Sequence, residues 1–189
     1  MPRGGRETDG AGRTFRKALQ RAVGAFRQAR APYMLIGAWA LGVWGRPRAT
    51  LDLDFMVMVD SDGLGRLGAR LTRRGVTVDE EWLEWNPMLR GSQLRLRFGP
   101  ITVDVLRPRD NHDRQAFKRR RRRRWGNHVY WFVGPEDLVL QKLKVGRPRD
   151  FEDAAGVLQR SGPALDAAYL RRWAGRLGIA AELGYVLQP

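Results

Sequence analysis

Three aspartates lie among apolar residues in two segments whose alternating pattern predicts β-strands. Asp52 and Asp54 are two residues apart in LDLDFMVMV, residues 51–59, and Asp104 lies in ITVDVL, residues 101–106. Side chains two apart in a strand share a face, so the Cα atoms of the first pair are roughly 7 Å apart on one side. Carboxylates among apolar neighbours are costly unless they are paired or bind a metal.

If the two strands are neighbours, these carboxylates converge on one patch. Their hard oxygen atoms suit Mg²⁺ or Mn²⁺, which also takes phosphate oxygens as ligands. A pair of such cations can activate an attacking oxygen and neutralise a leaving pyrophosphate. The alternative is that the aspartates simply face solvent on a one-sided sheet, and the strand pattern alone leaves both interpretations open.

A glycine upstream of the aspartate pair favours the first interpretation. Gly37 follows a short apolar strand, residues 33–36, and precedes a short apolar helix, residues 38–44. Backbone N–H groups exposed at such a turn can hold phosphate. Arg46 and Arg48 follow in the next loop, where their guanidinium groups are placed for a triphosphate.

A lysine downstream lies in a segment that Pro135 opens as a helix to about Val145. Lys142 is surrounded there by apolar residues, in a chain with only four lysines among its 35 basic residues. A flexible ammonium and a planar guanidinium bind anions with different geometry, so a lysine in a chain that otherwise uses arginine indicates a functional role. Lys144 is the alternative candidate for this role. The other interpretation is that Lys142 is a surface lysine without a functional role.

The formal net charge is +15, which favours polyanionic partners such as nucleic acid or nucleotides. The chain has no cysteine, which excludes disulfides and thiolate sites, and its two histidines make a multi-histidine zinc site improbable. No signal-like segment and no apolar stretch of membrane-spanning length is evident. We therefore expect a cytoplasmic protein without a membrane partner.

A run of seven basic residues is the densest charge in the chain. It is expected at the end of a helix from Asp113 to about Arg124, and Trp125 follows it as a stacking surface. A solvated helix face is one interpretation, and contact with an RNA backbone is the other. The run comprises Lys118, Arg119, Arg120, Arg121, Arg122, Arg123 and Arg124.

The elements that must position these residues indicate an α+β fold, with a mixed β-sheet core flanked by helices and a helical C-terminal portion. Further strands are expected over residues 76–83, 92–98 and 128–133, and Gly99-Pro100 predicts a hairpin turn. We expect a flexible basic arm over residues 1–13, a core over 14–134 with Thr14 capping its first helix, and a helical portion over 135–189.

The segment IGAWALGVWGRPRATLDLDFMV resembles the first motif of the polymerase-beta-type nucleotidyltransferases: a glycine, a small residue, a spacer and two acidic residues one apart. The aspartate of ITVDVL matches the second motif. PEDLVLQKLKVGRPRDFED is similar to two further motifs of the minimal nucleotidyltransferases related to AbiEii- and MenT-type toxins. Ala38 departs from the glycine or serine that the family often has.

The resemblance implies a role for each matching residue. Gly37 and Ala38, together with Arg48 and Lys142, would bind the nucleoside triphosphate, such as ATP. Asp52, Asp54 and Asp104 would ligate Mg²⁺ or Mn²⁺, with Asp104 alternatively acting as general base. Asp150 would orient Lys142 or the nucleotide, although Asp150 and Asp153 also fit the start of a helix after Pro148.

The implied function is transfer of a nucleoside monophosphate to an acceptor hydroxyl, with the 3′ end of tRNA as the expected acceptor. The resemblance further implies a toxin of a toxin–antitoxin system, with an antitoxin protein as partner. Two alternatives stay open: a small-molecule nucleotidyltransferase of the aminoglycoside type, and a non-catalytic module that keeps the fold and binds RNA or a protein partner.

Overall fold

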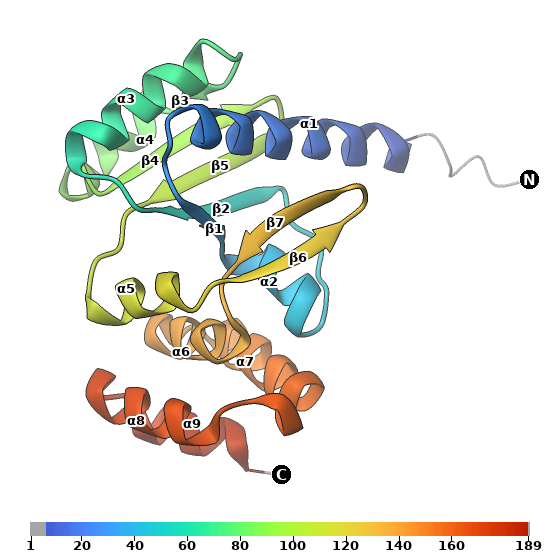
Figure 1. Ribbon diagram of the computed structural model, residues 1–189, viewed down its shortest axis with the longest axis vertical. Coiled ribbons are helices and arrows are strands. Elements are labelled where there is room, and N and C mark those ends of the chain that lie inside the picture. The colour runs from blue at the N-terminus through green and yellow to red at the C-terminus, as the bar shows by residue number, and fades with distance from the viewer. Residues whose placement is uncertain (1–6, 189) are drawn as a thin grey trace, which may run out of the picture. The chain divides into compact units, whose positions relative to one another are not determined.

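A computed structural model describes residues 7–188 of the chain, which divide into two compact units (Figure 1). Unit 1 comprises Met1–Tyr33 and Leu51–Arg109, and unit 2 comprises Met34–Thr50 and Asp110–Pro189. The expected boundary at residue 134 remains a prediction. None of the described helices has the length and apolar character that a bilayer crossing needs.

Unit 1 is built on four strands in the order β3-β4-β5-β2. Strand β2 runs parallel to β5, whereas β5 pairs antiparallel with β4 and β4 antiparallel with β3, so the sheet is mixed. The strands are β2 (Asp52–Val57), β3 (Thr77–Val78), β4 (Gln93–Phe98) and β5 (Ile101–Leu106), and the helices are α1 (Glu7–Gln28), α3 (Ser61–Thr72), α4 (Glu80–Trp85) and the 3₁₀ turn η1 (Pro87–Leu89).

One face of this sheet is apolar and covered. Leu53 and Phe55 of β2 are fully buried, and Phe55 meets the ring of Phe26 from α1 edge-on at 4.9 Å. On β4, Leu94 lies so close to α3 that a Cβ added at Gly68 would be 2.9 Å from it. Helices α1 and α3 therefore cover the same face, and the alternation of side chains sends the aspartates of β2 to the other.

Unit 2 contains three strands in the order β1-β7-β6, with β1 parallel to β7 and β7 antiparallel to β6. Its strands are β1 (Tyr33–Leu35), β6 (Arg121–Trp125) and β7 (His128–Phe132). Its helices and 3₁₀ turn are α2 (Gly37–Trp44), α5 (Asn111–Lys118), α6 (Pro135–Val145), α7 (Pro148–Ser161), η2 (Gly162–Ala164), α8 (Ala167–Leu177) and α9 (Ala180–Leu187). Both units thus confirm the expected α+β class with mixed strands and a helical C-terminal portion.

Helix α6 is the centre of unit 2. It contacts α2, α7, α8 and α9, and it is buried on nearly all sides, including the charged residues Glu136, Asp137 and Lys142. A helix surrounded in this way must find a partner for every polar group that it carries. The ion pairs of unit 2 are consequently organised around this helix.

Two expected elements differ from the structure. Residues 76–83 form the two-residue strand β3 and then α4, because Asp79 accepts a hydrogen bond from Trp82 N and caps a helix there. The basic helix expected over residues 113–124 begins at Asn111, after the cap Asp110, and ends at Lys118. The rest of the basic run forms β6, because successive arginines repel one another on a helix but alternate between two faces of a strand.

The first helix also begins earlier than expected. Residues 7–13 belong to α1, which starts at Glu7 rather than after Thr14. Only residues 1–6 of the expected N-terminal arm lie outside the described part of the chain.

Candidate functional site

Asp54 and Asp104 are direct partners across the parallel strands β2 and β5. Asp52 lies one pleat earlier on β2, opposite Thr102, and therefore faces the same side of the sheet. Asp52 is exposed, Asp54 is half-buried and Asp104 is buried. The structure thus brings the predicted carboxylates to one face of unit 1, on the side not covered by α1 and α3.

Asp104 is held by an arginine that the sequence interpretation did not include. Arg95 of β4 lies opposite Asp104 and donates two hydrogen bonds, Nε to Oδ1 at 2.9 Å and Nη2 to Oδ2 at 2.8 Å. Its guanidinium also lies over the ring of Trp82 from α4, 4.4 Å from the centroid. The hydrogen bond to Asp104, together with the charges of Asp104 and Asp52, raises the pKa of Arg95 despite its partial burial.

The signal that predicts Arg95 is present in the sequence. The two-residue turn Gly99-Pro100 fixes the register of its hairpin, with Phe98 opposite Ile101. Counting back from that pair places Arg95 opposite Asp104. The expected hairpin alone was therefore sufficient to find this contact.

Gly37 adopts a left-handed backbone conformation, with φ of 62°, which a residue with a Cβ adopts only at a cost. It is the first residue of α2, and the preceding N-cap Ile36 provides no side-chain hydrogen bond. The first turn of α2 also lacks an acidic residue. Among the described α-helices whose N-caps are assigned, α2 alone lacks both features, so neither an N-cap side chain nor an acidic residue of its own first turn compensates the positive end of the helix dipole. An anion is the partner that such a terminus favours.

Lys142 and Asp150 form a buried ion pair in unit 2. The ammonium Nζ lies 2.9 Å from Asp150 Oδ1 and 2.7 Å from Asp153 Oδ2. Arg147 donates from Nε to the other oxygen of Asp150 at 2.8 Å. Burial alone would raise the pKa of Asp150, but the hydrogen bonds from Arg147 and Lys142 outweigh it and hold the pKa below its ordinary value.

The loop after α2 reaches the same cluster. Arg48 Nε lies 3.6 Å from Asp153 Oδ1, so the cluster contains three cations, Arg48, Lys142 and Arg147, against two carboxylates. The surplus positive charge suits an anionic ligand. Asp150 is not the N-cap of α7, which is Arg147, although it lies in the first turn.

Lys144 points to a different group of residues. Its Nζ lies 2.5 Å from Asp110 Oδ2 and 3.4 Å from Asp113 Oδ1. Asp110, His112 and Asp113 are the one group of three ligand-type side chains, among the described residues, that places one ligand atom of each within 4.8 Å of the others. Because an ammonium already compensates both carboxylates, this group needs no metal ion for its stability.

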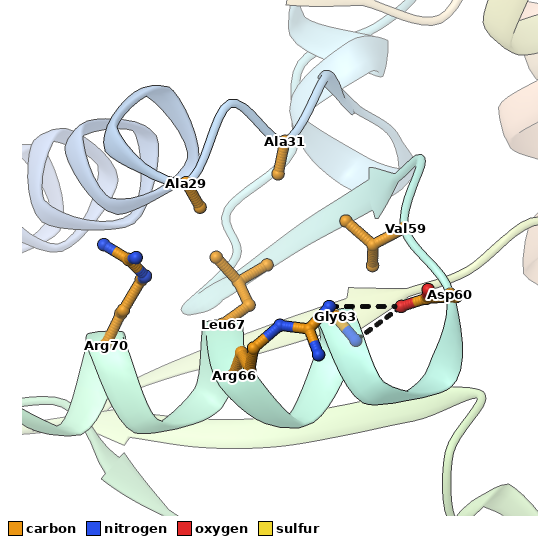
Figure 2. A pocket seen from close by; sticks show the side chains of 8 residues that line it. All are labelled: Ala29, Ala31, Val59, Asp60, Gly63, Arg66, Leu67 and Arg70. Atoms are coloured by element: carbon orange, nitrogen blue, oxygen red, sulfur yellow. Dashed lines mark hydrogen bonds and ion pairs between the residues drawn. The ribbon is translucent and has the colours of Figure 1, made fainter.

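A cavity of about 280 Å³ lies on the covered side of unit 1 (Figure 2). Figure 2 shows Arg66 and Arg70 of α3 lining it together with Ala29 and Ala31, near the end of α1. It contains none of the predicted site residues, because its walls come from α3, from the residues that follow α1 and from the loop between β2 and α3. The cavity therefore does not extend the candidate site.

No protein-family profile matches the chain, and no curated protein matches it by sequence. Solved structures do. ANT(2'')-Ia in complex with adenylyl-2''-tobramycin is 12% identical, with a TM-score of 0.55, over 84% of this chain and 94% of that one. The lincosamide antibiotic adenylyltransferase LnuA with lincomycin bound is 14% identical, with a TM-score of 0.53, over 75% of this chain and 94% of that one.

The chain has a nucleotidyltransferase fold. A solution structure of the antibiotic-resistance factor ANT(2'')-Ia agrees, with 14% identity and a TM-score of 0.53 over 84% of this chain and 92% of that one. Within the nucleotidyltransferase fold of this chain, Asp52, Asp54 and Asp104 lie in unit 1 and Gly37, Ala38, Arg48, Lys142 and Asp150 lie in unit 2. The fold expected from the motif resemblance is thereby confirmed, and the roles of these residues remain predictions.

Proposed function

We propose that the protein transfers a nucleoside monophosphate from a nucleoside triphosphate to an acceptor hydroxyl, with a divalent cation as cofactor. The observation that carries this proposal is the register that places Asp54 opposite Asp104, with Asp52 on the same face, in a nucleotidyltransferase fold. Carboxylates on a half-open face of a sheet are the oxygen ligands that Mg²⁺ and Mn²⁺ prefer. These cations supply Lewis-acid stabilisation of the reacting phosphate.

The three aspartates would have different roles in the reaction. Asp52 and Asp54 would hold the cations, while Asp104 would act as a further ligand or as general base. The acceptor oxygen forms a bond to the α-phosphorus, and the bond from that phosphorus to the bridging β-oxygen breaks, so that pyrophosphate leaves. In either role, the positive charge of Arg95, which donates one hydrogen bond to each oxygen of Asp104, would oppose the binding of a cation or a proton to that carboxylate.

A second set of residues is proposed to bind phosphate. The uncapped first turn of α2, beginning at Gly37, offers backbone N–H groups, and the neighbouring small Ala38 leaves room for a close approach. Arg48 and Lys142 belong to the cluster with surplus positive charge. Asp150 would hold Lys142 in place, consistent with their distance of 2.9 Å.

The acceptor that we propose is RNA, with the 3′ end of tRNA as the specific candidate. A net charge of +15 supports a polyanionic acceptor, because a neutral or cationic small molecule gains nothing from so basic a surface. The motif resemblance adds the proposal that the protein is a toxin restrained by an antitoxin protein. Small-molecule transfer is the second candidate, since ANT(2'')-Ia and LnuA are named for antibiotics.

The deciding experiment incubates the purified protein with Mg²⁺ or Mn²⁺ and each α-labelled nucleoside triphosphate. Parallel reactions contain tRNA, an aminoglycoside or a lincosamide. Label in the tRNA supports the proposal, whereas label in an antibiotic supports the second candidate. The variant Asp52→Asn/Asp54→Asn should lose activity, and Asp62→Asn, an exposed aspartate of α3, should retain it. No transfer by the wild type to any acceptor would identify a non-catalytic module.

A further inference from the structure

Most of the basic run, from Arg121 to Arg124, lies in an edge strand rather than on a helix face. Strand β6 pairs with β7 alone in the strand order, and the two are joined by a two-residue turn in which Gly126 has φ of 55°. The tip pairs Trp125 with His128. Four of the five residues of β6 are exposed, which is the arrangement of a strand with one free edge.

Two arginines of the run are neutralised inside unit 2. Arg119 lies 3.4 Å from Asp137 Oδ2 and 3.4 Å from Glu136 Oε2, and its guanidinium lies 3.8 Å from the centroid of the Tyr169 ring. Arg121 Nη2 lies 3.4 Å from Glu136 Oε1. These two residues pair with the acidic first turn of α6, so their charges are already compensated.

The next arginines have no such partner. Among the side chains that the structure describes, no carboxylate forms an ion pair with Arg122, Arg123 or Arg124. Arg120 donates from Nη1 to the carbonyl of Phe117 instead of to an acid. Uncompensated like charges at neighbouring positions repel one another, so an anionic ligand would stabilise them.

Stacking on indole rings divides these arginines between two faces. Arg120 and Arg122 both lie over the ring of Trp131 in β7, at 4.6 and 5.7 Å from the centroid. Arg123 lies over Trp44 of α2 at 4.4 Å. Because alternate residues of a strand share a face, Arg124 belongs with Arg120 and Arg122. We call these three residues the outer arginine face.

The stacking has an energetic consequence for binding. A guanidinium that rests on an aromatic ring retains its five donors but loses part of its rotamer freedom before the ligand arrives. Arg120 and Arg122, the two stacked members of the outer arginine face, therefore lose less entropy on binding phosphate than two free arginines would lose. Two guanidinium groups over one indole also concentrate positive charge at Trp131.

We propose that the outer arginine face binds the phosphodiester backbone of single-stranded RNA. A row of alternating cations supported by aromatic rings is typical of sequence-tolerant single-strand binding. An anionic membrane fits less well, because membrane-surface segments need an apolar face to insert, and the indole of Trp131 lies beneath guanidinium groups. The proposal rests on the proposed RNA acceptor and assigns the surface that would hold it.

The test measures binding of a fluorescein-labelled single-stranded RNA by anisotropy in EDTA, without nucleotide, over about 50–200 mM salt. Arg122→Gln/Arg124→Gln should weaken binding roughly tenfold and reduce the slope of log K against log salt by about 1.4, since each single-strand phosphate contact contributes about 0.7. The matched control Arg16→Gln/Arg171→Gln removes two other exposed arginines and should leave both quantities unchanged. Arg123→Gln, on the other face, should have little effect.

Equal losses in the control pair, or no loss in the Arg122/Arg124 pair, would overturn the proposal. Equally tight binding to phosphatidylserine vesicles with the same dependence on Arg122 and Arg124 would overturn it in favour of a membrane. The assay needs no turnover, so it is independent of the catalytic proposal. If Asp52→Asn/Asp54→Asn binds RNA like the wild type while no acceptor is ever labelled, the outer arginine face stands and the transfer reaction does not.

Discussion

The guanidinium of Arg95 donates a hydrogen bond to each oxygen of the Asp104 carboxylate, at 2.9 and 2.8 Å. This carboxylate is also the register partner of Asp54. A divalent cation bound between Asp54 and Asp104 would therefore compete with the guanidinium of Arg95 for the oxygen atoms of Asp104. In the structure, the carboxylate that we propose as the third ligand of the cation is therefore held by a positively charged side chain.

Removal of Arg95 should therefore tighten cation binding. In Arg95→Gln the carboxylate of Asp104 loses two charge-assisted hydrogen bonds, worth about 1.4 kcal/mol at this partly exposed position, so Mn²⁺ affinity should rise roughly tenfold. The affinity can be measured by electron paramagnetic resonance of free Mn²⁺. Arg97→Gln is the matched control, because Arg97 lies on the same strand but pairs with Asp79. An unchanged or weaker affinity in Arg95→Gln would contradict this competition.

Removal of Lys142 should destabilise the fold strongly. Lys142→Met leaves Asp150 and Asp153 facing each other without the shared ammonium, and breaking one partner of a buried pair costs about 3–5 kcal/mol. Arg147→Met removes a partner of the same Asp150 whose side chain is 73% exposed, and it should cost at most about 1 kcal/mol. Urea unfolding measures both free energies. Similar values for the two variants would show that Lys142 is not a structural ion.

Replacement of Gly37 by alanine should destabilise the protein through backbone strain, whereas the same replacement elsewhere in α2 should stabilise it through helix propensity. Gly37→Ala forces a residue with a Cβ to keep a φ of 62° and should cost about 1–2 kcal/mol, with weaker nucleotide binding because the turn shifts. Gly42→Ala, in the same helix with open space around its Cβ, should instead stabilise the protein by about 0.5–1 kcal/mol. Thermal unfolding and fluorescent-nucleotide titration measure the two effects. Equal effects at both positions would remove the argument for a special turn.

Acid should weaken the fold through Asp150. The pKa of Asp150 is lowered in the folded protein, so the unfolded chain binds its proton more readily. The stabilisation is present at pH values above the ordinary aspartate pKa of 3.8 and is lost as the pH falls through the lower folded pKa. Asp150→Asn should therefore lose less stability than the wild type between neutral pH and this acid range. Urea unfolding at each pH measures the free energy of unfolding of both proteins. If this free energy falls equally in both, the acid sensitivity belongs to other groups.

The elements around the carboxylates follow from local patterns. The period-two alternation at residues 51–59 and 101–106 predicts β2 and β5, and the structure confirms both. The turn Gly99-Pro100 predicts the hairpin of β4 and β5, which is also present. Gly37 was expected between a strand and a helix, and it starts α2 with a positive φ. Each of these features depends on residues that are close in sequence.

The features that the sequence did not predict depend on distant partners. The basic run was expected as a helix, because nothing local shows that Trp44 and Trp131 will be beside it to stack its guanidinium groups. Likewise, the pairing of Lys142 with Asp153 requires α6 and α7 to pack together. The contact between Arg95 and Asp104 is the exception, because the register of the local hairpin already places the two residues opposite each other.

The central claim is that the carboxylates of β2 and β5 hold the divalent cation. A Mn²⁺ titration followed by electron paramagnetic resonance tests it most directly, with wild type, Asp54→Asn and Asp110→Asn compared. Asp54 is the register partner of Asp104, whereas Asp110 belongs to the separate group that Lys144 compensates. We predict binding that Asp54→Asn weakens by at least about tenfold, the loss of one charged ligand, and that Asp110→Asn leaves unchanged. Binding that survives Asp54→Asn and is lost in Asp110→Asn would contradict the account.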